Sequence, residues 1–164
     1  MQLIKIIVLQ LYWYVSIKYG ANPSIPLLGL VIFTSDYLIF KRRENLNQRY
    51  IYFSFCLVLC GGLMDKLFSQ LGILTWGKDL YPPELLGVWV IFPTYYFRIF
   101  KKFENPKWLP FLMGALFGPL AYISGGRLNP SLVLSMDLEH LIVISFFWGL
   151  LFKVSLSLFP KFRA

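Results

Sequence analysis

The sequence predicts an all-α, polytopic membrane protein with six transmembrane helices. Three observations support this prediction: 57% of the 164 residues are hydrophobic, only 15% are charged, and the hydrophobic residues fall into six long runs. A soluble domain is roughly 45–50% apolar and about 25% charged. Because a membrane-spanning helix needs about 20 residues, six helices fill the chain. Residues 1–164 are therefore expected to form a single transmembrane domain.

The six predicted helices follow one another with short connections. They cover residues 3–19, 23–40, 50–74, 83–100, 107–125 and 139–159. Each run must be a helix, because isolated strands leave backbone groups without hydrogen bonds in lipid. The first run holds three consecutive aromatic residues and no small-residue cleavage site, which favours a retained helix over a signal peptide. The second run ends at a cluster of basic residues, and the third run is the longest.

The last three runs contain residues that shape helices. Pro93 in the fourth run and Pro119 in the fifth predict kinks, because proline removes a backbone hydrogen bond. Gly114 and Gly118 in the fifth run allow another helix to approach closely, and they are candidates for contacts with other membrane proteins. The charged residues of the sixth run are Glu139 at its start and Lys153.

Basic residues are distributed unequally among the connections, which predicts the orientation. Eleven of the 16 Lys and Arg residues lie in the two termini and in the connections around 41–49 and 98–107, while each of the other three connections holds one. Cytoplasmic loops carry an excess of Lys and Arg. We therefore expect a multi-pass protein of the bacterial inner membrane with both termini in the cytoplasm. The same rule explains the net charge of +8 without a nucleic-acid partner.

Three glycines in the outer turns suggest an internal repeat. Gly20, Gly72 and Gly125 lie 52 and 53 residues apart. This spacing fits three parallel helical hairpins related by an axis along the membrane normal. Any six-span protein with loops of similar length would show comparable spacing, so both interpretations stay open.

Polar residues gather in the outer half of the predicted bundle, where they are costly. A charged group inside a span costs roughly 2.5–3.5 kcal/mol on insertion scales, so Asp65 in the third run needs a partner; Lys66, Arg127 and the outer end of another helix are candidates. The predicted ligand-binding residues are Trp13, Asp65, Lys66, Ser69, Gln70, Tyr122 and Arg127. They line an outer-side polar cavity, or they satisfy one another and the lipid headgroups.

Signals for metals and cofactors are weak. His140 is the sole histidine, and Cys56 and Cys60 lie one turn apart in an apolar run, so neither a metal site nor a disulfide is expected. Asp137 and Glu139 beside His140 leave a catalytic or pH-sensing role open. No phosphate-binding or dinucleotide-binding loop is present, and we expect no cofactor.

Several segments resemble a known family. They are Leu9–Trp13, Met64–Phe68, Leu71–Leu74, Leu85–Phe92, Gly118–Tyr122 and Gly125–Leu128. With these segments the chain resembles a bacterial family of small inner-membrane proteins classed as a domain of unknown function, number twenty-eight seventy-eight. That family usually has Ser where this sequence has Lys66. The resemblance implies a role linked to membrane lipids, because such proteins are thought to be encoded beside genes for fatty-acyl or phospholipid modification.

Three classes of function are compatible with these features. The first is support of membrane-lipid modification or handling, with membrane lipids as partners and Arg127 suited to an anionic headgroup. The second is a small-solute transport or substrate-capture subunit, since six short spans also resemble the membrane subunits of energy-coupling-factor vitamin transporters. The third is an intramembrane enzyme that uses Asp65 as acid or base.

Overall fold

The computed structural model describes residues 2–19, 22, 24–44, 49–76, 83–100, 103 and 105–158. These residues form six helices and two short strands. The elements are α1 (Gln2–Tyr19), α2 (Ser24–Glu44), α3 (Arg49–Gln70), β1 (Leu74–Trp76), α4 (Pro83–Phe100), α5 (Leu109–Leu128), β2 (Leu132–Leu134) and α6 (Leu138–Leu158). The all-α prediction is confirmed. Among the described residues, α3, α5 and α6 are long and apolar enough to cross a membrane.

The third helix ends earlier than predicted. Gly72 adopts a left-handed conformation with φ of +72°, which glycine does without strain. The backbone N–H of Gly72 donates to the carbonyl of Ser69, and that of Ile73 donates to the carbonyl of Phe68. This pair of bonds is a Schellman motif, which closes a helix. Of the next two apolar residues, Ile73 lies in the bend after the helix and Leu74 begins β1.

The two strands join distant parts of the chain. β1 and β2 pair antiparallel, with Leu74 opposite Leu134 and Trp76 opposite Leu132. The backbone N–H of Ser135 also donates to the carbonyl of Ile73 at 2.9 Å. The segment after α3 is thereby fixed to the segment between α5 and α6. Neither strand was predicted from the sequence.

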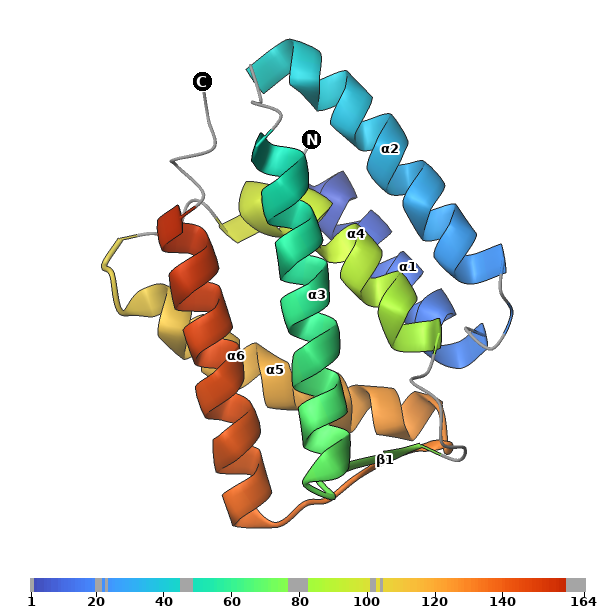
Figure 1. Ribbon diagram of the computed structural model, residues 1–164, viewed down its shortest axis with the longest axis vertical. Coiled ribbons are helices and arrows are strands. Elements are labelled where there is room, and N and C mark those ends of the chain that lie inside the picture. The colour runs from blue at the N-terminus through green and yellow to red at the C-terminus, as the bar shows by residue number, and fades with distance from the viewer. Residues whose placement is uncertain are drawn as a thin grey trace.

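The helices form two groups with different packing (Figure 1). We call α5, β2 and α6 the C-terminal hairpin, and α1 to α4 the N-terminal helices. α5 and α6 contact each other more extensively than any other pair, whereas α4 packs against α1, α2 and α3. One end of the molecule holds the start of α1, the end of α6 and the two ends at which α2 and α3 face each other. The strand β1 lies at the other end.

The described residues do not confirm the predicted hairpin repeat. Gly72 ends α3, whereas Gly125 lies inside α5, where it is buried against Leu132. Gly20 lies outside the described residues, as do 45–48 of the basic connection and the basic residues of the C-terminus. The repeat therefore stays a prediction.

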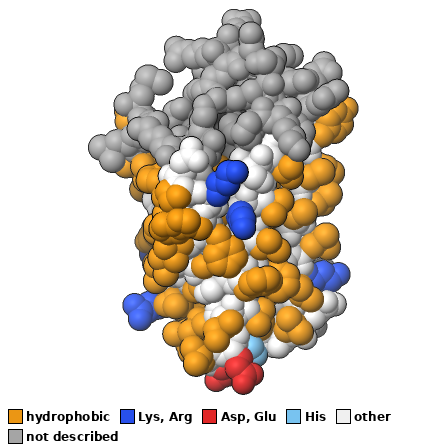
Figure 2. All heavy atoms as spheres, turned by 90° about the vertical axis from the view of Figure 1, so that its left-hand side faces the viewer, with side chains coloured by type: hydrophobic (Ala, Val, Ile, Leu, Met, Phe, Trp, Pro, Cys, Tyr) orange, Lys and Arg blue, Asp and Glu red, His pale blue; other side chains and the backbone are white. Residues whose placement is uncertain are grey.

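Large apolar side chains lie both inside and outside the molecule. Figure 2 shows hydrophobic side chains over most of the described surface of one face, and exposed examples include Leu63, Ile142 and Leu116. Acidic side chains gather at the lower end of that face, and the exposed acidic residues in the described part are Asp137 and Glu139. An apolar outer surface of this kind is typical of helices that face lipid.

Candidate functional site

Asp65 is the centre of the candidate site. It lies on α3 and is 0% exposed. The buried face of α3 includes Leu57, Gly61, Asp65 and Phe68. These residues follow one another at intervals of three or four positions, which places them on one side of the helix. Asp65 is one turn from Gly61 on that side. A carboxylate on an apolar, buried face requires hydrogen-bond donors.

Two aromatic side chains supply these donors. Trp89 Nε1 of α4 donates to Asp65 Oδ2 at 2.6 Å. The hydroxyl of Tyr122 on α5 donates to Asp65 Oδ1. The site therefore joins three helices, and the bond from Tyr122 connects the C-terminal hairpin to the N-terminal helices. Hydrogen bonds to a charged acceptor are stronger than those between neutral groups.

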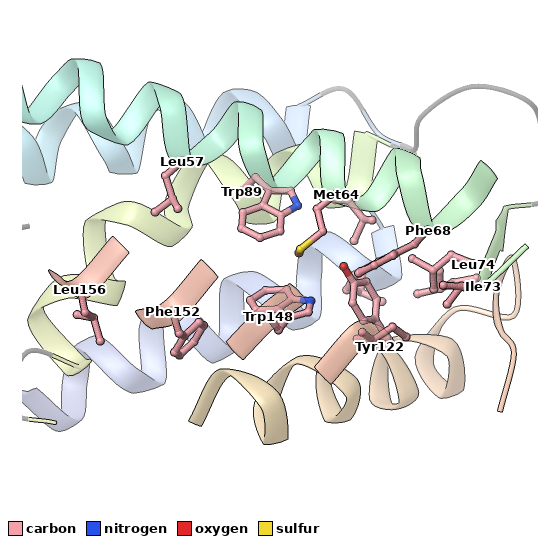
Figure 3. Close-up of a cluster of buried hydrophobic side chains, with 14 of the residues drawn as sticks. Leu57, Met64, Phe68, Ile73, Leu74, Trp89, Tyr122, Trp148, Phe152 and Leu156 are labelled. Carbon is pink, nitrogen blue, oxygen red and sulfur yellow. The ribbon is translucent and has the colours of Figure 1, made fainter. Parts of the chain in front are cut away.

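A shell of aromatic rings surrounds the two donors to Asp65, and Figure 3 shows Trp89, Trp148, Tyr122 and Phe68 in it. Trp148 of α6 stacks on Trp89 with ring centroids 5.2 Å apart, and it meets Tyr122 at 6.1 Å. Phe68 packs edge to face against Tyr122, also at 6.1 Å. Aromatic pairs at these distances add stability beyond their buried area. The shell keeps water away from Asp65 in this packing.

Two glycines allow the rings to pack this closely. A Cβ at Gly61 would lie less than 3.0 Å from ring atoms of Trp89, and a Cβ at Gly118 would lie equally close to Trp148. Gly114 has the same relation to the backbone of Trp148. Gly114 and Gly118 thus serve the packing of α5 on α6. Their predicted contacts with other proteins stay untested.

The structure brings together only part of the predicted ligand-binding set. Asp65 and Tyr122 are hydrogen-bonded, while Lys66, Gln70 and Arg127 are exposed on the surface. Ser69 and Trp13 are half-buried, and Trp13 packs against the apolar core. The donors to Asp65 are Trp89 of α4 and Tyr122 of α5. Lys66 and Arg127 are not the hydrogen-bond donors that the structure shows for it.

Sequence reasoning missed two members of the site. Trp89 was noted only as part of a segment shared with the family, and Trp148 was not singled out. A tryptophan in the middle of an apolar run carries an N–H that needs an acceptor when it is buried. That requirement, set beside a buried carboxylate, is the signal that would have pointed to Trp89.

The residues around His140 form a separate cluster at the start of α6. Ser135 Oγ donates to Asp137 Oδ2 at 2.8 Å, and His140 Nδ1 lies 2.7 Å from Ser135 Oγ. His140 Nδ1 is also 3.6 Å from Asp137 Oδ2. In a nucleophilic triad the two ring nitrogens serve different partners, whereas here one nitrogen faces both. The cluster orders the first turn of α6, where the backbone N–H of Leu141 donates to the carbonyl of Asp137.

Comparison with known proteins identifies a family. The family model described as "Protein of unknown function (DUF2878)" matches residues 2–154, which is almost the whole chain. No curated protein and no solved structure matches the chain.

Proposed function

The chain belongs to the DUF2878 family of proteins of unknown function, and we propose that it is an integral membrane protein that holds the polar end of a lipid-like molecule next to Asp65. In this role it supports the modification or handling of membrane lipids. The carboxylate and its aromatic shell offer polar and apolar contacts within a few side chains of each other, as an amphipathic ligand requires.

The observation that carries this proposal is the hydrogen bond between Tyr122 and Asp65. It crosses from the C-terminal hairpin to the N-terminal helices, whose mutual contacts are fewer than those within each group. A buried ion can be replaced by well-packed apolar residues with little loss of stability, or with a gain. A carboxylate at such a boundary is therefore better explained by ligand binding than by packing.

The ligand reaches Asp65 when the two groups of helices separate slightly. Asp65 is fully enclosed in the present packing, so the site opens only by movement of the hairpin against the N-terminal helices. The close contact of Gly114 and Gly118 with Trp148 makes the hairpin a unit that moves as one body. Lipid surrounds the apolar outer faces, so an amphipathic molecule enters sideways from the bilayer.

The proposal includes six spans in the bacterial inner membrane with both termini in the cytoplasm. It is supported by Figure 1, in which α1 begins, α6 ends and α2 meets α3 at the same end of the molecule. An alkaline-phosphatase fusion at residue 45 should be inactive, because phosphatase needs the periplasm. An active fusion would contradict this orientation.

Lipid mass spectrometry of a deletion strain tests the function. We expect deletion to change the lipid profile and the wild-type gene to restore it. Asp65→Asn should fail to restore it at equal expression, whereas Glu139→Gln, which changes an exposed carboxylate, should restore it fully. Full restoration by Asp65→Asn would show that the carboxylate has no role in the function.

One observation favours a second candidate, an intramembrane enzyme that uses Asp65 as acid or base. The hydroxyl of Tyr122 and the carboxylate are in direct hydrogen-bond contact, which is the arrangement through which a proton is passed. An assay of the purified protein with an added precursor lipid distinguishes the two candidates. An enzyme would convert the precursor into product, and a binding protein would not. The transport alternative predicts vitamin-dependent growth, and no contact in the described residues favours it.

A further inference from the structure

Trp148 carries a buried hydrogen-bond donor that no described residue uses. The side chain is 8% exposed, and its Nε1 has no hydrogen-bond partner in the described part of the chain. The large majority of buried polar side-chain atoms in proteins have a partner, and each exception needs an explanation. The cost of leaving this N–H unpaired indicates a partner that is present only when a ligand is bound.

This donor belongs to the Asp65 site. The Trp148 ring stacks on Trp89 and packs against Tyr122, and both of those residues donate to Asp65. In Figure 3 the indole nitrogen of Trp148 lies on the side of the ring that faces Tyr122. The site thus holds three aromatic donors, of which two are committed to the carboxylate.

We propose that Trp148 Nε1 binds an uncharged carbonyl oxygen of the ligand. This inference rests on the proposed function, because it concerns the same site. A neutral N–H among aromatic rings suits a neutral acceptor, since one neutral donor does not offset the cost of burying a phosphate or carboxylate. The Asp65 carboxylate two rings away would also repel an anion. Two kinds of membrane molecule offer such a carbonyl: acyl esters and quinones.

The packing explains how the carbonyl reaches Nε1. Trp148 lies against Gly114 and Gly118 of α5, and it meets the N-terminal helices through two rings of α4, stacking on Trp89 and packing edge to face against Phe92. When the two groups separate, these ring contacts part together with the bond from Tyr122 to Asp65. The indole edge and Asp65 then become accessible through one opening.

Binding of three probes to the purified full chain tests the inference. The probes are dioleoyl phosphatidylethanolamine, its diether counterpart without ester carbonyls, and a ubiquinone with a short isoprenoid tail. Dissociation constants are measured by native mass spectrometry for the wild type and for Trp148→Phe, which keeps an aromatic ring without the N–H. Trp108→Phe is the matched control, because Trp108 is 60% exposed before α5.

Loss of one hydrogen bond corresponds to about a tenfold change in affinity. We expect Trp148→Phe to weaken the binding of the diacyl lipid by this factor. The binding of the diether should not change, because the diether has no ester carbonyl that could accept a hydrogen bond from Trp148. If only ubiquinone shows the dependence on Trp148, the carbonyl is that of a quinone. Trp108→Phe should match the wild type throughout.

Two results would overturn the inference, and they differ in what they imply for the proposed function. If the wild type binds the carbonyl probes and Trp148→Phe binds them equally well, the N–H has no role although the proposed function stands. If the wild type binds none of the probes, the proposed function fails as well. Should Trp148→Phe not fold, 3-benzothienylalanine at position 148 keeps the shape of the indole without its N–H and gives the same comparison.

Discussion

Gly61 is the position at which one methyl group is expected to disturb the Asp65 site most. A Cβ at Gly61 would lie less than 3.0 Å from three ring atoms of Trp89. Because nonbonded carbon atoms rest at about 3.5–4.0 Å, the ring must move by at least about 0.5 Å. Trp148 stacks on the same ring at 5.2 Å, so the ring cannot simply slide away, and α3 and α4 must separate.

The magnitude follows from these contacts. Extra methyl groups in a packed core cost about 1–3 kcal/mol. Movement of the ring also lengthens the bond from Trp89 Nε1 to Asp65, which is 2.6 Å in the structure, and bonds to charged groups are worth about 1.5–3 kcal/mol. With part of that bond lost, we expect Gly61→Ala to reduce the free energy of unfolding by about 2–4 kcal/mol.

Unfolding in detergent micelles, followed by tryptophan fluorescence, measures this change. The control is Cys60→Ala, because Cys60 is the exposed neighbour on α3 and surface changes usually stay within about 0.5 kcal/mol. In a Trp89→Phe background, Gly61→Ala should cost less than in the wild type, since the smaller ring leaves room for the methyl group. If Gly61→Ala unfolds like the wild type, the packing of Trp89 on Gly61 is wrong.

Two further predictions use the same unfolding measurement. Tyr122→Phe removes a donor to Asp65 and should cost about 1–2 kcal/mol. The control Tyr52→Phe changes an exposed side chain and should cost nothing measurable. The loss caused by Tyr122→Phe should be smaller in an Asp65→Asn background. Gly118→Ala places a Cβ against the ring of Trp148 and should cost about 1–3 kcal/mol by forcing α5 away from α6. An unchanged midpoint for Tyr122→Phe would show that its bond to the carboxylate contributes nothing to the fold.

The helices were predictable because length and hydropathy determine them. The residues at which the helices end were harder to predict. The third run was predicted to reach residue 74, because Ile73 and Leu74 are as apolar as the helix before them. Hydropathy cannot distinguish a buried strand residue from a helix residue. The left-handed glycine at position 72 decides the end, and the partner strand 58 residues later, in which Val133 faces Thr75, could not be inferred from local sequence.

Of the residues that form the site, only Asp65 and Tyr122 were predicted from the sequence. Asp65 stands out in the sequence because a charge in an apolar run needs an explanation, and Tyr122 was grouped with it by position along the membrane normal. Periodicity gives the face of a helix on which a residue lies, but not which helix that face meets. For this reason Lys66 and Arg127 were included, although both are exposed, and Trp89 on α4 was left out.

The energetics of Asp65 argue for a role beyond packing. A carboxylate in a span costs roughly 2.5–3.5 kcal/mol on insertion scales. The bonds from Trp89 and Tyr122, worth about 1.5–3 and about 1–2 kcal/mol, offset this cost and leave little net stabilisation. A leucine at this position would remove the cost and still fill the space between Gly61 and Phe68. Ligand binding at this position explains three features together: the carboxylate, the boundary that it bridges and the unused donor of Trp148.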